Sequence, residues 1–489
     1  MKITRKQRIV LIDYFPHTDA YLSTYPINNN SIPVANRSYF ITDINNSTDV
    51  DDSVYLFPLL LEADGTPWHV ANMFLLKLAT TINEYVGFKD TKDIRKKATF
   101  LLDYKIFCES TKDNKNELAP TDLFDFKHPL KSRRPTWRYY SHLVNVEKTK
   151  PELLNAKTGT IYQFYRFAAT LPNVDLDLQR VETLTNFSFF KQTSSGSLYL
   201  LEGEKRSQTV RVAEAVPVNI GYVRDEGEDL RPLFQKELDA LLKALQTDEF
   251  ATDEKLIFYL ALCTGERKQT ILTMRMRHLA FFEEQYLSQK KKSYKLFANR
   301  QNGCDTKYDK PHILHVPIWL AEKIKIWANS KKANQRREKF KKRFGNFFND
   351  DDMYLFLSPA GDCRYMSHSD PRYRKTLSPA LGQVTRNLKA KLLKITEHKI
   401  SPDFTFHWLR ATFAMLLYKR CQKLIADKKM VAGTELNHIR YRLHHTHQST
   451  TEHYLRLFSQ TNELIGAQEA FENVLFGDVL QNQDVSDNV

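Results

Sequence analysis

The sequence has few cysteines, no long apolar run and no excess of acidic residues, and each absence excludes a class of protein. Five cysteines stand far apart among 489 residues, and no two of them form a C-x-x-C pair. This argues against a disulfide framework and a cysteine-based zinc site, and it favours a reducing environment. The apolar runs at 9–12 and 54–61 are too short for a signal peptide or a bilayer span. We therefore expect a soluble cytoplasmic protein with no membrane partner.

Basic charge is what the sequence has in excess. Lys and Arg together number 72 against 58 for Asp and Glu, which gives a formal net charge of +14. Such an excess favours a polyanionic partner, of which nucleic acid is the usual one. The alternative is a basic protein without such a partner.

The patterning of apolar residues divides the chain into regions. Residues 1–70 are rich in Asn, Asp, Ser and Pro and predict an appended region or arm, whereas 71–185 repeat apolar residues at helical intervals. Residues 186–228 indicate a linker with some strand, and 229–475 indicate a mixed α and β unit. Residues 476–489 predict a disordered acidic tail. The length and these patterns together predict a multidomain, mainly α fold with a small β-sheet.

Local composition predicts several elements in the second half. Residues 292–300 and 312–318 have strand composition and flank a polar turn region. Residues 319–344 predict one helix whose second half is strongly basic. Residues 353–358 predict a short strand.

Basic residues lie among aromatic residues in the helical region and recur in two later segments. Helix faces of this kind can rest on phosphates, although solvated faces around an aromatic core would look the same. The segment 331–343 holds eight Lys or Arg in thirteen positions, which favours DNA or an acidic partner surface. The candidate DNA-binding residues are Arg133, Arg134, Arg138, Lys157, Arg166, Lys290, Lys291, Lys292, Arg336, Arg337, Lys341, Lys342 and Arg343.

Three short patterns carry candidate chemistry. Arg267 follows T-G in CTGERKQT, His407 and Arg410 stand at i and i+3 in FHWLRATFA, and Tyr454 follows His445 by nine residues in RLHHTHQSTTEHYLRL. Each alone has a plain explanation: the end of a helix, satisfied side chains on a core helix, or a core tyrosine. The histidine run could bind zinc, but no carboxylate or Cys with ligand spacing accompanies it, so we predict no metal site.

The order and spacing of these patterns resemble the tyrosine recombinase or phage integrase family. The family motif L-G-H, followed by a polar stretch and S-x-T-T-x-x-Y, is similar to this chain at Leu443, His445, Thr450, Thr451 and Tyr454. The family's H-x-L-R-H-T-F-A resembles residues 407–414. The resemblance covers about 230–470, and more loosely 71–185. It implies a helical core-binding domain followed by a mixed α/β catalytic domain.

The chain departs from the family pattern at three positions. Thr270 stands where the family often has an acidic residue, Ala411 replaces a His, and His444 replaces the Gly before His445. These positions support the site, and the doubled His leaves His444 as a second choice for His445. The family also has a Lys on a β-hairpin, for which Lys307 fits and Lys310 is the alternative.

The resemblance implies a division of roles in breaking a DNA phosphodiester. Arg267 and Arg410 would hold the phosphate, His407 would accept or orient the proton of the nucleophile Tyr454, His445 would bond the phosphate, and Lys307 would be the general acid. No G-x-x-x-x-G-K-[S/T] loop and no acidic cluster for a two-metal site stand out, so no cofactor is expected. The candidate catalytic set is Arg267, Lys307, His407, Arg410, His445 and Tyr454.

The same resemblance implies partners and leaves two other functions open. It implies double-stranded DNA attachment sites, a homo-oligomer that is a tetramer on DNA, accessory DNA-bending proteins, and a mobile element in a bacterial cytoplasm. The apolar stripe of residues 463–476 fits docking onto a neighbouring protomer or packing on its own domain. A type IB topoisomerase would use a similar residue set, and a decayed integrase would only bind DNA.

Overall fold

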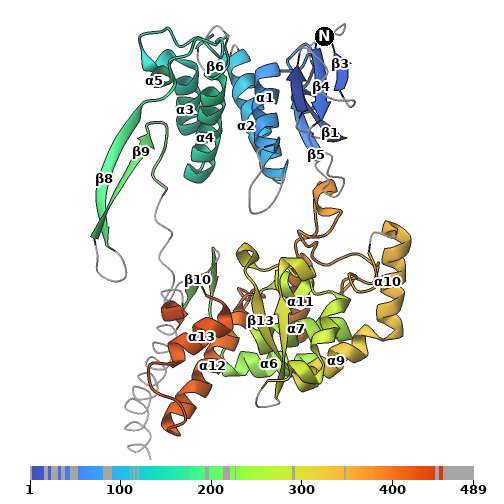
Figure 1. Cartoon of the computed structure of the whole chain (residues 1–489). Coiled ribbons are helices and arrows are strands. Elements are labelled where there is room, and N and C mark those ends of the chain that lie inside the picture. The colour runs from blue at the N-terminus through green and yellow to red at the C-terminus, as the bar shows by residue number, and fades with distance from the viewer. Residues whose placement is uncertain are drawn as a thin grey trace, which may run out of the picture. The chain divides into compact units, whose positions relative to one another are not determined.

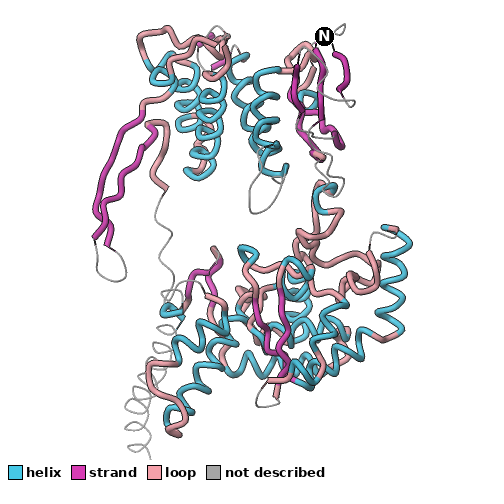
Figure 2. The backbone as a smooth tube through the Cα atoms, viewed as in Figure 1, coloured by secondary structure: helices cyan, strands magenta, loops and turns pink. Residues whose placement is uncertain are grey.

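The computed structural model divides the chain into two compact units, residues 1–214 and 215–489 (Figure 1). The division falls within the segment 186–228 that was expected to be a linker. The expected fold class is confirmed, because helices predominate and the sheets are small and antiparallel (Figure 2). The residues that the structure describes are 3–15, 20–23, 31–34, 39–43, 53–80, 91–110, 112–113, 116–117, 120–172, 174–192, 198–212, 221–225, 227–288, 292–345, 348–445 and 451–454.

Helices supply most of the core of the N-terminal unit. Two of them begin at a proline, Pro135 and Pro151, where the missing N–H costs no hydrogen bond. Apolar residues at three- and four-residue spacing, such as Ile161 and Phe164, turn one face of each helix into a shared core. The helices are α1 (His69–Thr80), α2 (Thr91–Glu109), α3 (Pro135–Asn145), α4 (Pro151–Ala168), the short α5 (Leu178–Val181), and the 3-10 turns η1 (Arg5–Arg8) and η2 (Lys131–Arg133).

Strands from the first sixty residues belong to the same unit. The strand β5 buries Val54, Phe57 and Leu60 in the core that the helices share, and Trp68 packs on Phe164 at 5.6 Å between ring centroids. Part of the region expected as an appended region or arm thus contributes side chains to the core that the helices share. The pairs are β1 (Ile9–Phe15) with β5 (Val54–Leu60), β2 (Ala20–Ser23) and β3 (Ser31–Val34) with β4 (Tyr39–Asp43), β6 (Lys112–Asp113) with β7 (Asn116–Glu117), and β8 (Leu184–Gln192) with β9 (Leu198–Arg206).

The C-terminal unit is built around helix α7 (Thr252–Thr264). Its side chains Leu256, Ile257 and Leu260 are almost completely buried, as expected for a helix that is apolar on all sides. It packs against α12, α9 and β13. The other helices are α6 (Gln235–Gln246), α8 (Lys268–Leu272), α9 (Ile318–Ala328), α10 (Lys331–Phe344), α11 (Val384–Ile395), α12 (Trp408–Ala426) and α13 (Glu435–Leu443), with 3-10 turns η3 (Met276–Phe281), η4 (Glu284–Tyr286), η5 (Arg300–Asn302), η6 (Lys307–Asp309) and η7 (Tyr373–Lys375).

Two hairpins accompany these helices. Strand β10 (Val223–Asp225) pairs with β11 (Glu228–Leu230), and β12 (Ser293–Ala298) pairs with β13 (His312–Pro317) in register Ser293 with Pro317. The second hairpin confirms the two strands expected at 292–300 and 312–318. Its strands alternate buried and less buried residues, so one face joins the core of the unit.

Two expectations about local structure are wrong. Residues 319–344 are two helices rather than one, because Ser330 caps a new helix by accepting a hydrogen bond from the amide of Ala333. Residues 353–358 contain only isolated bridges, such as Tyr354 to Arg275. The buried side chains of this segment explain its strand-like composition, since burial rather than pairing requires them.

Of the helices in the described part of the chain, none combines the length and the apolar character that crossing a bilayer requires.

Candidate active site

A glycine turn at the end of α7 positions Arg267. Gly265 adopts φ 70°, the left-handed conformation that ends helices, and its N–H caps the carbonyl of Ala261. A Cβ at this position would lie 2.3 Å from the ring of Phe413, so the turn packs tightly on α12. The chain then places Glu266 and Arg267 immediately before α8.

Arg410, in the first turn of α12, bridges two chain segments. Its side chain is buried, and its guanidinium donates to the carbonyl of Gly265 at 2.6 Å and to that of Leu443 at 2.5 Å. These carbonyls end α7 and α13, whose last turns have no intrahelical donors. One cation therefore joins the segment of Arg267 to the segment of His445.

His407 and Arg267 line one pocket. His407 directly precedes α12, and its Nδ1 lies 4.0 Å from Oε2 of Glu228. The pocket has a volume of about 330 Å³ and includes Arg386 and Lys389 of α11 in its lining. These two cations were not expected, although their i and i+3 spacing on an amphipathic helix was visible in the sequence. The lining holds four Lys or Arg side chains against the two carboxylates of Glu228 and Glu266, and this net positive charge suits an anionic group.

His445 follows α13 and is buried beside Tyr454. Its Nδ1 is 3.0 Å from Oγ1 of Thr451, and its ring centroid is 5.5 Å from that of Tyr454. Burial, together with the positive charges of Arg410 and Arg267, lowers the pKa of His445 to about 2. The imidazole is therefore neutral near pH 7. Its Nε2 is buried and has no hydrogen-bond partner among the described residues.

Tyr454 is fully buried. It closes a helical turn over residues 451–454 and belongs to the core of the C-terminal unit. Thr451, at the start of that turn, makes the hydrogen bond to His445. The phenol is thus held close to His445 by its own short segment.

The two candidate lysines occupy the connection between β12 and β13. Lys307 lies in the turn η6, with its ammonium 5.3 Å from the ring centroid of Tyr308. Lys310 instead lines a hollow of about 600 Å³ together with His444 and His445. Lys310, the alternative lysine, therefore shares a hollow with His445, whereas Lys307 lies in the turn η6.

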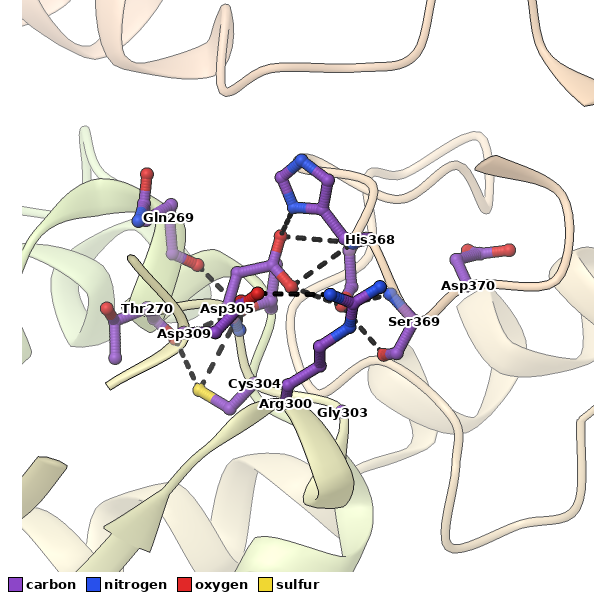
Figure 3. A network of polar contacts seen from close by, with 12 residues as sticks. Gln269, Thr270, Arg300, Gly303, Cys304, Asp305, Asp309, His368, Ser369 and Asp370 are labelled. Carbon is purple, nitrogen blue, oxygen red and sulfur yellow. Dashed lines mark hydrogen bonds and ion pairs between the residues drawn. The ribbon is translucent and has the colours of Figure 1, made fainter. Parts of the chain in front are cut away.

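A polar network anchors this connection (Figure 3). Asp305 is buried and accepts hydrogen bonds from Nδ1 of His368 and from Oγ of Ser367, both at 2.7 Å. Arg300 and Asp309 form an ion pair of 3.0 Å across the same connection. Asp305 thereby ties the lysine-bearing segment to the loop around residue 368 and raises the pKa of His368 through that hydrogen bond.

Glu266, His312 and His444 form a second cluster that the sequence patterns did not indicate. Oε1 of Glu266 lies 3.2 Å from Nδ1 of His312 and 3.3 Å from Nε2 of His444. Burial would raise the pKa of Glu266, but the hydrogen bond from His312 and the charge of Arg410 hold it at about 2. The carboxylate is therefore an anion at neutral pH.

These three residues have the ligand types of a metal centre, with candidate ligand atoms within 4.8 Å of one another. However, the rings of His312 and His444 are stacked at 4.0 Å with planes 9° apart. An imidazole binds a metal through a lone pair in its ring plane, and two parallel, separated planes cannot share that point. This conformation fits a carboxylate that accepts a hydrogen bond from His312 at Oε2, with the imidazole of His444 3.3 Å from Oε1.

The chain is similar to site-specific recombinases. A XerH recombinase in a post-cleavage complex with palindromic difH substrate is 15% identical, with 81% of this chain and 94% of that chain covered and a TM-score of 0.37. The Tn1549 transposon integrase with right-end DNA is 11% identical over 82% and 99%, with a TM-score of 0.37. The XerA recombinase is 14% identical over 82% and 98%, with a TM-score of 0.27.

No family model and no curated protein matches the sequence. TM-scores of 0.27 to 0.37 carry no argument about function, so that argument rests on the geometry of the site.

Several candidate DNA-binding residues are engaged inside their own unit. The buried guanidinium of Arg134 donates to the carbonyls of His128 and Pro129, and Lys157 forms ion pairs with Asp103 and Glu147. These two side chains hold the N-terminal unit together.

The same holds for most of α10. Arg336 pairs with the buried Asp253, Arg337 donates to the carbonyl of Ala328, and Lys341 and Arg343 pair with acidic neighbours. Of the remaining candidates, Arg133, Arg166, Lys292 and Lys342 are exposed, Arg138 is half-buried, and Lys290 and Lys291 lie outside the described residues.

Proposed function

We propose that the chain is a tyrosine recombinase, which cuts and rejoins DNA at specific sites through a covalent bond to Tyr454. One observation carries the proposal: the buried guanidinium of Arg410 joins the turn before Arg267 to the end of α13, where His445 lies beside Tyr454. Arg410 donates to the carbonyls of Gly265 and Leu443, and the ring centroid of His445 is 5.5 Å from that of Tyr454. These are the groups that breaking a phosphodiester with a phenol requires.

The two arginines would neutralise the phosphate. A guanidinium carries five N–H groups and stays charged, so Arg410 can hold two carbonyls and still contact a phosphate oxygen. Each contact that strengthens as charge develops is worth about 3 kcal/mol of transition-state stabilisation, by analogy with oxyanion-hole donors. The neutral His445 would add one hydrogen bond from its buried Nε2.

The reaction exchanges one ester for another. The phenol oxygen of Tyr454 attacks phosphorus and passes its proton to His407, while the bond from phosphorus to the 5′ oxygen breaks. The departing oxygen takes a proton from the lysine, Lys307 or Lys310. The 5′ hydroxyl of a second strand then attacks the 3′-phosphotyrosine and frees Tyr454. Because an ester is present throughout, no ATP is needed.

The resemblance in sequence extends this proposal to the biological setting. The chain would act as a homo-oligomer, a tetramer, on double-stranded attachment sites in a bacterial cytoplasm, with accessory DNA-bending proteins. The reaction would integrate or excise a mobile element. The exposed Arg133, Arg166, Lys292 and Lys342, and the pocket cations Arg386 and Lys389, are the side chains offered to phosphates.

A covalent adduct is the direct test. Nicked duplexes tiled across the DNA that flanks the gene would trap the protein after cleavage. The short strand between the cleavage point and the nick carries the new 5′ hydroxyl, and once it diffuses away it cannot reverse the reaction. We expect an adduct that resists denaturation and disappears in Tyr454→Phe, while that variant still binds the same duplex. Binding without any adduct in the wild type would instead support the decayed, DNA-binding alternative.

Strand exchange separates the remaining alternative. Two labelled duplexes that carry the trapped site should yield recombinant strands. Relaxation of supercoiled plasmid without recombinant strands would support a topoisomerase and contradict the recombinase.

A further inference from the structure

The carboxylate of Glu266 is a point at which three distant segments of the C-terminal unit meet. Glu266 comes from the turn after α7, His312 begins β13, and His444 follows α13. Nδ1 of His312 forms a hydrogen bond of 3.4 Å with Oε2 of the carboxylate and lies 3.2 Å from Oε1, and Nε2 of His444 lies 3.3 Å from Oε1. All three side chains are largely buried, with exposed fractions of 1% for Glu266, 4% for His312 and 13% for His444.

Each member of this cluster is a near neighbour in sequence of a candidate catalytic residue. Glu266 precedes Arg267, His444 precedes His445, and His312 follows Lys310 by two residues. A shift of any one member would therefore move the adjoining catalytic side chain.

The cluster duplicates a connection that Arg410 makes through the backbone. Arg410 donates to the carbonyl of Gly265, the residue before Glu266, and to that of Leu443, the residue before His444. The turn after α7 and the turn after α13 are thus joined twice. The guanidinium of Arg410 binds a carbonyl in each, and the carboxylate of Glu266 in the first contacts the imidazole of His444 in the second. Only the anionic connection also reaches the lysine-bearing hairpin, through His312.

We propose that Glu266, His312 and His444 are positioning residues, which fix Arg267, His445 and the lysine-bearing connection in one arrangement around the scissile phosphate. This inference rests on the function proposed above. On this proposal His444 supports the site, so a histidine in place of the family's glycine is no sign of a decayed enzyme. It also explains how the site lacks a carboxylate at Thr270, whose buried Oγ1 has no partner in the described part of the chain.

Backbone geometry supports the importance of His444. Its φ is 54°, a left-handed conformation that costs a residue with a side chain free energy. The stacked ring of His312 and the contact to Glu266 offset that cost, and they hold the chain so that His445 turns toward Thr451. Loss of Glu266 would release both imidazoles at once.

The test uses the full chain and the nicked duplex that traps wild-type adduct. Supporting hydrogen-bond partners of active-site ligands typically matter by a factor of about 10–100. We expect Glu266→Ala to slow adduct formation by about that factor at saturating DNA, while DNA affinity changes less than twofold. Glu266→Gln keeps a side-chain oxygen that can accept the hydrogen bond from His312, so we expect it to recover part of the rate. Equal rates for wild type and Glu266→Ala would overturn the proposal.

A matched control separates positioning from general stability. Asp253 is also a buried carboxylate of this unit, held by Arg336 and Arg364, but it contacts none of the candidate catalytic residues. Asp253→Asn should lower the thermal unfolding temperature and leave the rate of adduct formation at a permissive temperature unchanged. If it slows the reaction as much as Glu266→Ala does, the role of Glu266 is structural only.

A double-mutant cycle tests whether Glu266 acts through His444. Residues that share one interaction are non-additive, so Glu266→Ala with His444→Ala should cost no more than the larger single effect. Multiplying effects would contradict the positioning triad. Because every comparison requires a wild-type adduct, failure of wild type to form one would count against the proposed function, whereas an insensitive Glu266→Ala counts against this inference alone.

Discussion

The guanidinium of Arg410 donates a hydrogen bond of 2.6 Å to the carbonyl oxygen of Gly265. The two residues are 145 positions apart, yet this bond places the start of α12 against the turn that carries Arg267. A second bond from the same guanidinium reaches Leu443. The residue proposed to bind the phosphate is therefore also the residue that assembles the walls of its own site.

Arg410→Lys should damage both stability and chemistry. A lysine has a single ammonium and cannot reproduce a fork that reaches two carbonyls, so at least one buried acceptor would lose its partner. We expect a loss of about 2–4 kcal/mol in the free energy of unfolding, together with loss of adduct formation. Urea denaturation and the nicked-duplex assay measure the two effects, and a variant as stable as wild type would show that the bridge contributes little.

A comparison of Gly265→Ala with Gly433→Ala should separate the cost of backbone strain from the cost of a steric clash with Phe413. Both glycines have positive φ, 70° and 89°, but a Cβ at 265 would meet Phe413 at 2.3 Å, whereas nothing lies within 4 Å at 433. We expect a loss of about 1 kcal/mol for the second variant from backbone strain alone. The first should lose at least about 2 kcal/mol, because the collision adds to the strain. Equal changes in unfolding midpoint would argue against tight packing of this turn on α12.

The identity of the general acid can be decided with a modified leaving group. A bridging sulfur at the 5′ position leaves as a thiolate, which needs no proton, whereas oxygen does need one. Because Lys310 lines the hollow that contains His445, we expect Lys310→Ala to lose most activity on the oxygen substrate and to regain it on the sulfur substrate. Lys307→Ala should show little difference between the substrates, and the opposite pattern would assign the acid to Lys307.

Stability should fall on mild acidification because neutral histidines are buried at the site. Burial lowers the pKa of His444 to about 4 and that of His445 to about 2, against 6.5 for a free histidine. Below pH 6.5 the unfolded chain therefore binds more protons than the folded one, and the free energy of unfolding decreases. Glu266, with its pKa held at about 2, adds stability above pH 4.5 that is lost toward pH 2.

The measurement is the urea midpoint between pH 7.5 and 5. We expect it to decline through this range, and His444→Gln should flatten the decline because one of the titrating groups is removed. A midpoint independent of pH would show that these imidazoles gain protons as readily when folded as when unfolded.

Much of the architecture was predictable from local patterns. Strands β12 and β13 were expected because β-type residues flank a polar turn. The break at Ser330 was missed, since the basic and apolar character continues across it and only the cap divides the helix. The segment at Tyr354 was mistaken for a strand because burial selects the same residues as pairing does.

The sequence by itself determined the candidate catalytic set and its order, because the resemblance that implies this set rests on short patterns that can be read without any knowledge of the fold. Only the tertiary structure decided which side chains share a site. Glu266 and His312 stand 46 residues apart and belong to no motif, so their contact arises solely from the way the turn after α7 meets β13. Likewise, the pairing of Arg336 with the buried Asp253 depends on burial, which composition cannot report. Contacts between distant segments depend on how helices and hairpins pack, and that packing is set by the whole core rather than by any local run of residues.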